Sequence, residues 1–213
     1  MLKNRLQAVY NEIENGSVVA DIGCDHGKLS CELLVSNKAQ KVIAVDISKE
    51  SLQKTIDLKQ KLNLPNLITR VGDGLQVVDK DEVDTVVIAG MGGMEIIKIL
   101  SNSKNTFKKY ILVPHSNSKE LREYLSKRFF IKKDYLVKEN KKYYFVIVAV
   151  EGKSNLTLEQ LEFGNDFDNP LLKELLEKKL AEFTGYLKNA KVEGEVVQLE
   201  QKISLIKKVL NNA

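Results

Sequence analysis

The stretch VVADIGCDHG at residues 18–27, followed by KVIAVD at residues 41–46, decides the fold of this chain. The first segment is an apolar run that ends in a glycine-containing turn, and the second is an apolar run that ends at Asp46. A strand, a glycine turn, a helix and a second strand ending in a carboxylate form the front half of a nucleotide-cofactor fold, where that carboxylate binds ribose hydroxyls. We therefore predict that Asp46, with Ile47 beside it, belongs to a cofactor site.

The composition of the turn argues against a dinucleotide. A pyrophosphate binds a G-x-G-x-x-G turn, whereas three residues separate Gly23 from Gly27 here. Asp21 and Asp25 flank the turn, and carboxylates repel a pyrophosphate but attract the ammonium and sulfonium groups of S-adenosylmethionine. The turn favours S-adenosylmethionine over NAD, although such a motif alone is equally compatible with a glycine turn that binds no ligand.

Apolar runs bounded by turn signals alternate with helix-length segments through the first 128 residues. The expected strands are 18–22, 41–45, 67–71, 85–89 and 110–113, and the expected helices lie near 27–36, 48–62, 92–101 and 117–128. This alternation predicts a parallel sheet with helices on both faces. Residues 132–138 and 143–150 are expected to add an antiparallel hairpin. Five strands plus a hairpin match the seven-stranded, Rossmann-like α/β sheet of class I S-adenosylmethionine-dependent methyltransferases.

Two further loops follow strands of this sheet, and ligands of doubly wound sheets bind outside the carboxyl ends of the strands. Gly72, Asp73 and Gly74 follow the third strand, where the acid can accept a hydrogen bond from an adenine amino group. The loop 90–93 follows the fourth strand, and its small residues leave room for the methionine arm of the cofactor. The cofactor residues predicted in this loop are Gly90, Met91 and Gly92.

The C-terminal part of the chain has a different pattern. Apolar residues recur four and three positions apart from Leu172 to Ala190 and again from Val192 to Leu210. This spacing predicts two helices that turn around 190–194 and pack as an antiparallel coiled coil. We therefore expect two domains, a Rossmann-like methyltransferase domain at 1–152 and a helical coiled-coil domain at 153–213.

Composition indicates a globular chain of 213 residues, of which 43% are hydrophobic. The longest apolar runs are too short to span a bilayer, and no signal-peptide pattern opens the sequence, so no membrane association and a cytoplasmic location are expected. Cys24 and Cys31 have neither a disulfide framework nor zinc-ligand spacing, and no metal site is predicted. Residues 104–142 carry 12 basic and 4 acidic side chains, which is compatible with a phosphate-binding face or with a solvated lysine-rich surface.

Several of these motifs together resemble a known family. They are Arg5–Leu6, the segment ADIG at 20–23 with Asp25–His26, the segment GDGL at 72–75 and the segment IAGMGG at 88–93, together with a C-terminal coiled coil. Over essentially its whole length the chain is similar to the bacterial tRNA (adenine-22 N1) methyltransferases. The resemblance implies tRNA as the partner, S-adenosylmethionine as the cofactor and methylation of adenine N1 as the activity. Where relatives have a base-holding turn after the fifth strand, this chain has VPHS at 113–116.

The hypothetical mechanism is a direct attack of adenine N1 on the methyl carbon, aided by a carboxylate that stabilises the charge gained by the base. Asp25 is the candidate for that role, and a helix cap is the alternative for the same residue. His26 and His115 are the other catalytic candidates; for His26, hydrogen bonding to the backbone is the alternative. The candidate substrate contacts are Arg5, Pro114, His115 and Tyr144, with a solvated Arg5 and a core Tyr144 as their alternatives.

Two other functions are compatible with the same cofactor loops. The protein could methylate a small molecule or another RNA site, or it could be a non-catalytic module that binds the cofactor and recruits partners. The coiled coil either grips RNA through Lys178, Lys179, Lys188 and Lys191 or forms a dimer. We expect a tRNA methyltransferase, with a monomer as the favoured state.

Overall fold

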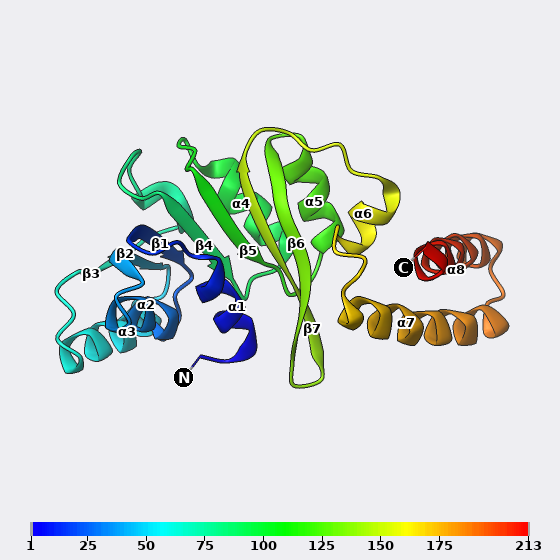
Figure 1. Cartoon of the computed structure of the whole chain (residues 1–213), viewed down its shortest axis with the longest axis horizontal. Helices are drawn as coiled ribbons and strands as arrows, with labels where there is room; N and C mark the ends of the chain where they lie inside the picture. Colours follow the sequence, from blue (N-terminus) through cyan, green and yellow to red (C-terminus); the bar gives the residue numbers. More distant parts are fainter. Residues whose placement is uncertain (1, 213) are drawn as a thin grey trace. The chain divides into compact units, whose positions relative to one another are not determined.

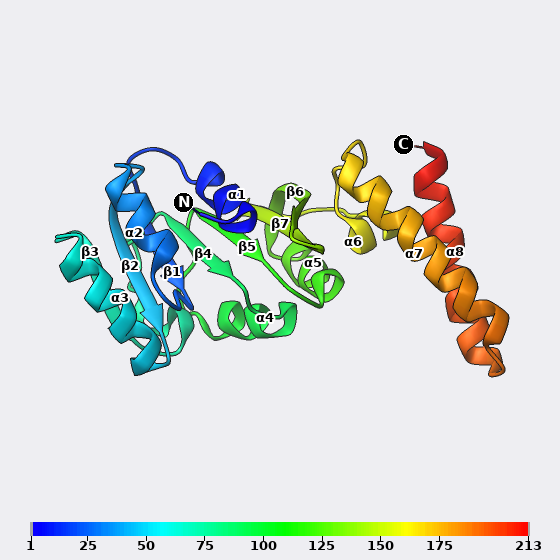
Figure 2. The same cartoon turned by 90° about the horizontal axis from the view of Figure 1, so that it is seen from below.

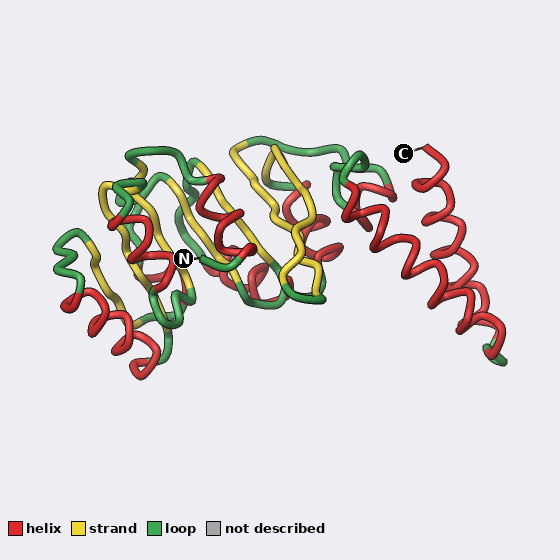
Figure 3. The backbone as a smooth tube through the Cα atoms, turned by 60° about the horizontal axis from the view of Figure 1, so that its bottom comes forward, coloured by secondary structure: helices red, strands yellow, loops and turns green. Residues whose placement is uncertain are grey.

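The computed structural model describes residues 2–212. The chain divides into two compact units, Met1–Asn155 and Leu156–Ala213. The first unit alternates strands and helices, whereas the second contains helices only (Figure 3). The sequence-based prediction put the boundary between the units slightly earlier, at residues 152 and 153.

The first unit is built on one seven-stranded sheet with the order β3-β2-β1-β4-β5-β7-β6 (Figure 1). The strands are β1 Ser17–Ile22, β2 Ala39–Asp46, β3 Leu67–Val71, β4 Thr85–Ala89, β5 Lys109–Val113, β6 Phe129–Glu139 and β7 Lys142–Glu151. The first five strands pair in parallel, and β7 runs antiparallel to both β5 and β6. The predicted seven-stranded α/β fold is confirmed, and the strand order reverses between β1 and β4, where such sheets open a ligand crevice.

The central strands are buried along nearly their whole length, as expected for a parallel sheet covered on both faces. The helices of this unit are α1 Asn4–Glu12, α2 Lys28–Val35, α3 Lys49–Lys61, α4 Gly93–Asn102 and α5 Ser118–Ser126, with a 3₁₀ turn η1 at Gly74–Val77. Helices α1 and α2 pack in one apolar cluster with the sheet, and α4 lies on the opposite side from α1 (Figure 2). Both faces of the sheet are therefore covered.

The hairpin strand β6 begins at Phe129, three residues before the strand predicted at 132–138. The pairing with β7 shifts between Ile131 and Lys133, which leaves Lys132 at a bulge. A bulge interrupts the alternation of inward and outward side chains on which the prediction relied. The sequence pattern therefore showed only the part of the strand beyond the bulge.

The second unit contains α6 Leu158–Phe163, α7 Pro170–Asn189 and α8 Glu193–Asn212. Thr157 and Gln160 form a capping box at the start of α6, and Asn169 caps α7 ahead of Pro170. The interface between the helices contains the buried side chains Phe163, Leu172, Leu176, Ile206 and Val209. The chain thus forms the predicted helical hairpin, with Val209 rather than Leu210 fully buried in its seam; its description as a coiled coil stays a prediction. None of the described helices has the length and apolar content needed to cross a membrane.

A buried ion pair joins α5 to the β6–β7 hairpin. The guanidinium of Arg122 donates to both carboxylate oxygens of Asp134, over 2.6 and 3.1 Å. Both side chains are almost fully buried, and the guanidinium also lies 4.1 Å from the ring centre of Phe145. Removing one partner of such a pair leaves the other charge buried without its partner.

We expect the substitution Asp134→Ala to lower the free energy of unfolding by about 3–5 kcal/mol, because it leaves the Arg122 charge buried. The double variant Arg122→Met/Asp134→Leu is expected to recover most of that loss, because it removes both charges. Urea unfolding measures the free energy of unfolding of the single and double variants. Lys132→Ala, a change of an exposed side chain on the same strand, is the control. Equal losses in the single and double variants would contradict this account.

Candidate active site

A pocket of about 530 Å³ opens at the carboxyl ends of strands β1 to β4. Its walls come from the loops that follow these strands, from one side of α4 and from the start of α1. The predicted site residues that line it are Asp21, Gly23, Asp25, His26, Asp46, Ile47, Gly72, Asp73, Gly74, Gly90, Met91 and Arg5. The structure therefore brings most of the predicted residues to one cavity.

The turn after β1 needs glycine for steric reasons. Gly23 has a φ of +69°, and a Cβ at this position would lie 2.2 Å from Cε of Met91. Gly27 has a φ of +64°, and its Cβ would lie 2.5 Å from Cγ2 of Thr55. L-residues with a side chain rarely adopt such angles, and a side chain would also have to displace Met91 at the first position or Thr55 at the second. The turn consequently lies close to both the β4 loop and α3.

The carboxylate of Asp46 is fixed at the end of β2. Its Oδ2 accepts a hydrogen bond from the main-chain N–H of Asp25 over 3.1 Å, and its Oδ1 accepts from that of Ser48 over 2.9 Å. Each carboxylate oxygen can accept a second hydrogen bond. Asp46 therefore has an orientation set by the backbone and lone pairs left to bind hydroxyl groups in the pocket.

Asp21 is a buried carboxyl group, with 5% of its surface exposed. The hydroxyl of Ser30 donates to its Oδ2 over 2.6 Å. Burial raises the pKa of Asp21 to about 6, and the hydrogen bond from Ser30 offsets only part of that rise. A buried carboxylate at the wall of a pocket stabilises a cation that enters it, because the local dielectric constant is low.

Asp25, His26 and Lys54 form a chain of polar contacts at the rim of the pocket. Nδ1 of His26 lies 2.6 Å from Oδ2 of Asp25, and Nε2 of His26 lies 3.0 Å from Nζ of Lys54. Because an ammonium can only donate, the contact with Lys54 assigns the acceptor role to Nε2 and the proton to Nδ1. Both ring nitrogens of His26 are thus engaged.

The backbone at Asp25 is strained. Its φ is +49°, an uncommon angle for a residue other than glycine. The main-chain N–H of Asp25 is bound to Asp46, and its carbonyl oxygen accepts a hydrogen bond from the Thr55 hydroxyl over 3.1 Å. Strain of this kind persists only where neighbouring contacts fix the conformation, and it is frequent at functional sites. The side chain of Asp25 stays mostly exposed, at 69%.

The loops after β3 and β4 complete the cofactor side of the pocket. The main-chain N–H of Gly72 donates to the carbonyl oxygen of Asp46 over 3.1 Å, while the Asp73 side chain is exposed. Ile47 is 73% exposed, so its aliphatic side chain is available to pack against a flat ring. Met91 fills the space next to Gly23. This side of the pocket thus offers a carboxylate for hydroxyls and apolar surface for a base.

Four predicted residues do not line the pocket: Gly92, Pro114, His115 and Tyr144. Gly92 is the N-cap of α4 and Pro114 is buried. His115 has an exposed side chain and donates its main-chain N–H to the carbonyl oxygen of Met91 over 3.0 Å. Tyr144 reaches the pocket through Arg5, whose guanidinium lies 5.0 Å from the tyrosine ring centre.

Sequence reasoning missed several pocket residues. Glu95, Lys98 and Ile99 line it from α4, and their spacing of three and four places them on one side of that helix. This periodicity was a usable signal once the helix was placed. The contact of Lys54 with His26 gave no such signal, because Lys54 lies on α3 and His26 lies 28 positions earlier, in the turn before α2.

Both cysteines, Cys24 and Cys31, are free thiols with buried side chains. Burial, helped by the charge of Asp21, raises the pKa of Cys24 to about 12 and that of Cys31 to about 11. Within residues 2–212 no group of three histidine, cysteine or acidic side chains is arranged to bind a metal ion.

The sheet order and the cavity at the carboxyl edge define a class I methyltransferase, and residues 2–147 match the family model described as a methyltransferase domain. A tRNA (adenine(22)-N(1))-methyltransferase of Bacillus subtilis is 38% identical over 156 residues, which are 71% of this chain and 66% of that protein, just under two thirds of its length.

Two solved structures match the fold over nearly the whole chain. The M1A22 tRNA methyltransferase TrmK of B. subtilis has a TM-score of 0.89 and 29% identity, and covers 99% of both chains. TrmK of M. capricolum in complex with S-adenosyl-homocysteine has a TM-score of 0.91 and 28% identity, and covers 99% of this chain and 98% of that one. The chain belongs to the methyltransferase-domain family, and its similarity to the TrmK structures extends over nearly its whole length.

The substitution Asp21→Asn is expected to stabilise the protein at pH 8 by about 3 kcal/mol, because it removes a buried charge whose pKa is raised to about 6. As the pH falls from 6 toward 4, the wild-type carboxyl group becomes protonated in the native state, and the advantage of the variant disappears. Urea unfolding of both proteins across this pH range measures the difference. Asp73→Asn, a change of an exposed carboxyl group, is the control. A difference in unfolding free energy between Asp21→Asn and wild type that does not change with pH would contradict the expectation.

Proposed function

We propose that the protein transfers a methyl group from S-adenosylmethionine to N1 of adenine 22 in tRNA. The observation that carries the proposal is the agreement with two TrmK structures over 99% of this chain, one of them in complex with S-adenosyl-homocysteine. The charge pattern of the pocket is consistent with it, because Asp21, Asp25 and Asp46 all line the cavity and favour a cationic cofactor over a pyrophosphate.

S-adenosylmethionine is the cofactor, and it supplies a methyl group bound to a positively charged sulfur. The carboxylate of Asp46 would accept hydrogen bonds from ribose hydroxyls, and Asp73 one from the adenine amino group. Ile47 would cover the adenine ring, and the charge of Asp21 would favour the cationic part of the cofactor. Gly23 has no side chain, and the end of the Met91 side chain occupies the space next to it.

Adenine N1 carries a lone pair in the neutral base, so no base is needed to activate it, and positioning is the main task of the protein. We assign to Asp25 the stabilisation of the positive charge that the base gains on methylation. His26 and Lys54 would act as positioning residues, because the proton on Nδ1 of His26 orients the Asp25 carboxylate. With both ring nitrogens engaged, His26 is poorly placed to take a proton from the substrate.

The substrate side consists of Arg5, Tyr144 and the segment at Pro114 and His115. Arg5 lines the pocket and covers the Tyr144 ring, so an extruded base would meet a cationic side chain that is backed by an aromatic ring. His115, next to the β4 loop, would contact the base from outside the cofactor pocket, supported by Pro114. Gly92 would keep this entrance open, since a Cβ there would approach the Ser116 hydroxyl to 3.2 Å.

The location of the protein, its oligomeric state and the roles of its two domains complete the proposal. We propose that it works in the cytoplasm as a monomer, and that the domain at 1–152 performs the chemistry. In the domain at 153–213, the helices α7 and α8 would contribute to RNA binding. Size-exclusion chromatography with light scattering on the full chain measures the oligomeric state.

Incubation with S-adenosylmethionine and unmodified tRNA transcripts is expected to yield 1-methyladenosine when position 22 is adenine and none when it is guanine. Nucleoside mass spectrometry detects the product. Methylation that persists in the guanine variant would move the target to another site of the RNA. Binding of the cofactor without any methylated nucleoside would instead favour a small-molecule substrate or a binding module.

The substitution Asp25→Asn is expected to lower kcat about 10- to 100-fold, because the carboxylate charge near the methylated base is lost. Lys54→Met should lower kcat by a smaller factor, about threefold, because His26 then loses one of its two contacts. Affinity for S-adenosyl-homocysteine, measured by calorimetry, should stay within about threefold in both variants. Lys61→Met, a change of an exposed lysine on the same helix, is the control, and a loss in Lys54→Met no larger than in this control would remove Lys54 from the proposal.

A further inference from the structure

The β6–β7 hairpin extends beyond the rest of the sheet. The last pair between β5 and β7 is Leu112 with Ile147, whereas β6 and β7 continue to pair as far as Glu139 with Lys142. Residues 138–144 therefore form a two-stranded tip that no other strand flanks, and its turn projects at the bottom of Figure 1. We call this segment the hairpin tip.

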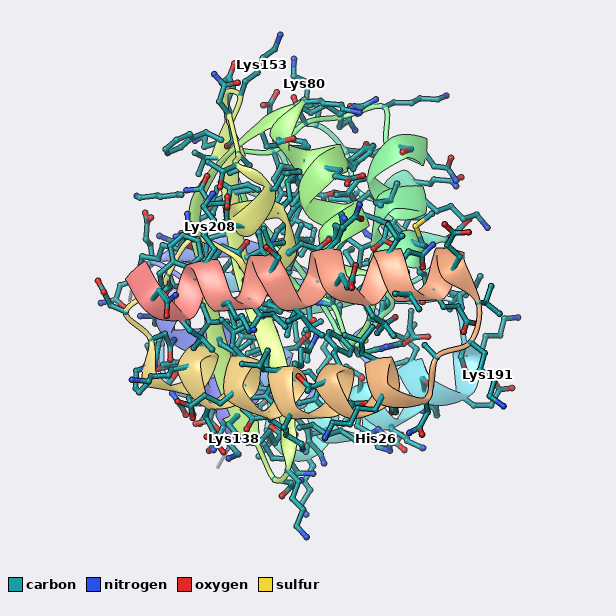
Figure 4. The ribbon with its side chains drawn as sticks, turned by 90° about the vertical axis from the view of Figure 1, so that its right-hand side faces the viewer. His26, Lys80, Lys138, Lys153, Lys191 and Lys208 are labelled. Atoms are coloured by element: carbon teal, nitrogen blue, oxygen red, sulfur yellow. The ribbon has the colours of Figure 1, made fainter. Side chains whose placement is uncertain are left out.

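The hairpin tip projects from the same end of the sheet as the pocket. Because β7 runs antiparallel to β5, its first residues lie beyond the carboxyl end of β5. Figure 4 shows His26 and Lys138 at one end of the sheet-bearing unit, with Lys80 and Lys153 at the other. The hairpin tip is thus an extension of the edge where the substrate base is modified.

Helix α1 braces the hairpin tip. The side-chain amide of Asn4 donates to the carbonyl oxygen of Lys138 over 3.0 Å, and the main-chain N–H of Arg5 donates to Glu139 over 3.1 Å. At the other end of the helix, Glu12 accepts hydrogen bonds from side chains of β6. These hydrogen bonds therefore hold the hairpin tip next to Arg5, which lines the pocket.

The chemistry of the tip is cationic and aromatic. Lys141 and Lys142 are exposed, and Nζ of Lys138 lies 5.1 Å from the ring centre of Tyr143. Lysines of this kind bind phosphates, and aromatic rings beside them stack on unpaired bases. Tyr144, the neighbouring tyrosine, lies under the guanidinium of Arg5.

Arg5 connects the tip to the pocket and has an unused donor. Its Nε is buried, and within the described residues it has no hydrogen-bond partner. One of its terminal nitrogens would lie 4.0 Å from a Cβ on Gly90, at the substrate side of the cavity. A guanidinium with an unused buried donor is suited to a phosphate or base edge that arrives with the substrate.

We propose that the hairpin tip is an RNA-binding arm that holds the sugar–phosphate backbone next to the nucleotide delivered into the pocket. Lys141 and Lys142 bind phosphates of the flanking nucleotides, and the Lys138–Tyr143 pair receives a neighbouring base. Arg5 joins this contact to the pocket. The proposal rests on the proposed function, since it requires an RNA substrate.

The test compares the double variant Lys141→Ala/Lys142→Ala with Lys80→Ala/Lys153→Ala, which removes two exposed lysines at the opposite end of the same unit. Affinity for the tRNA transcript is measured by fluorescence anisotropy at several salt concentrations. The variant of the hairpin tip is expected to bind about tenfold more weakly at low salt, and its slope of log K against log salt should be smaller by about 2. Affinity for S-adenosyl-homocysteine and the thermal midpoint should be unchanged, and the control pair should bind tRNA within about twofold of wild type.

An unchanged affinity and salt slope in the variant of the hairpin tip, with wild-type protein that methylates adenine 22, would overturn this proposal alone. An equal loss in both double variants would overturn it as well, because it would indicate a general effect of net charge. A wild-type protein that neither binds nor methylates tRNA would overturn the proposed function and the RNA-binding arm together.

Discussion

The main chain at the end of strand β2 is the constraint on which the site depends. The carbonyl oxygen of Val45 accepts hydrogen bonds from Gly23 and Cys24 over 2.8 and 3.1 Å, and that of Asp46 accepts one from Gly72. The Asp46 side chain adds the contact with Asp25. Two consecutive residues thereby fix the loop after β1 and the loop after β3, so the cofactor side of the pocket is one connected backbone structure rather than a set of independent loops.

Three carboxylates of this site differ mainly in their exposure, and that difference separates their roles. Asp21 is buried beside Ser30, so its charge is costly and acts through the low dielectric constant of the interior. Asp46 has an orientation fixed by main-chain donors. Asp25 is exposed at the rim on a strained backbone, where it can meet a substrate. Under the proposed function, the same chemical group would therefore stabilise a cation, bind hydroxyls and face the substrate at three positions of one cavity.

Sequence patterns predicted the fold well because apolar β-branched runs and helix-length segments alternate clearly between residues 18 and 128. The same patterns placed Gly23 and Asp46 at the carboxyl ends of strands, where the structure has the pocket. They could not identify Lys54, whose contact with His26 depends on how α3 packs against the turn. They also missed the bulge at Lys132, because an extra residue breaks the alternation that marks a strand. The sequence therefore predicted the elements that have a local periodicity, but not the contacts that form when these elements pack together.

The position of Arg5 has a consequence for the order in which the protein can fold. The cofactor side of the pocket is built by residues 21–99, whereas the N–H of Arg5 is bound to a residue 134 positions away, in the last hairpin of the sheet. Contacts between distant parts of a chain form late, because closing a long loop costs entropy before any contact compensates for it. During synthesis the loops after β1 to β4 can therefore be assembled before β6 and β7 are made. The side of the pocket at Arg5, which we propose as the substrate wall, is completed last.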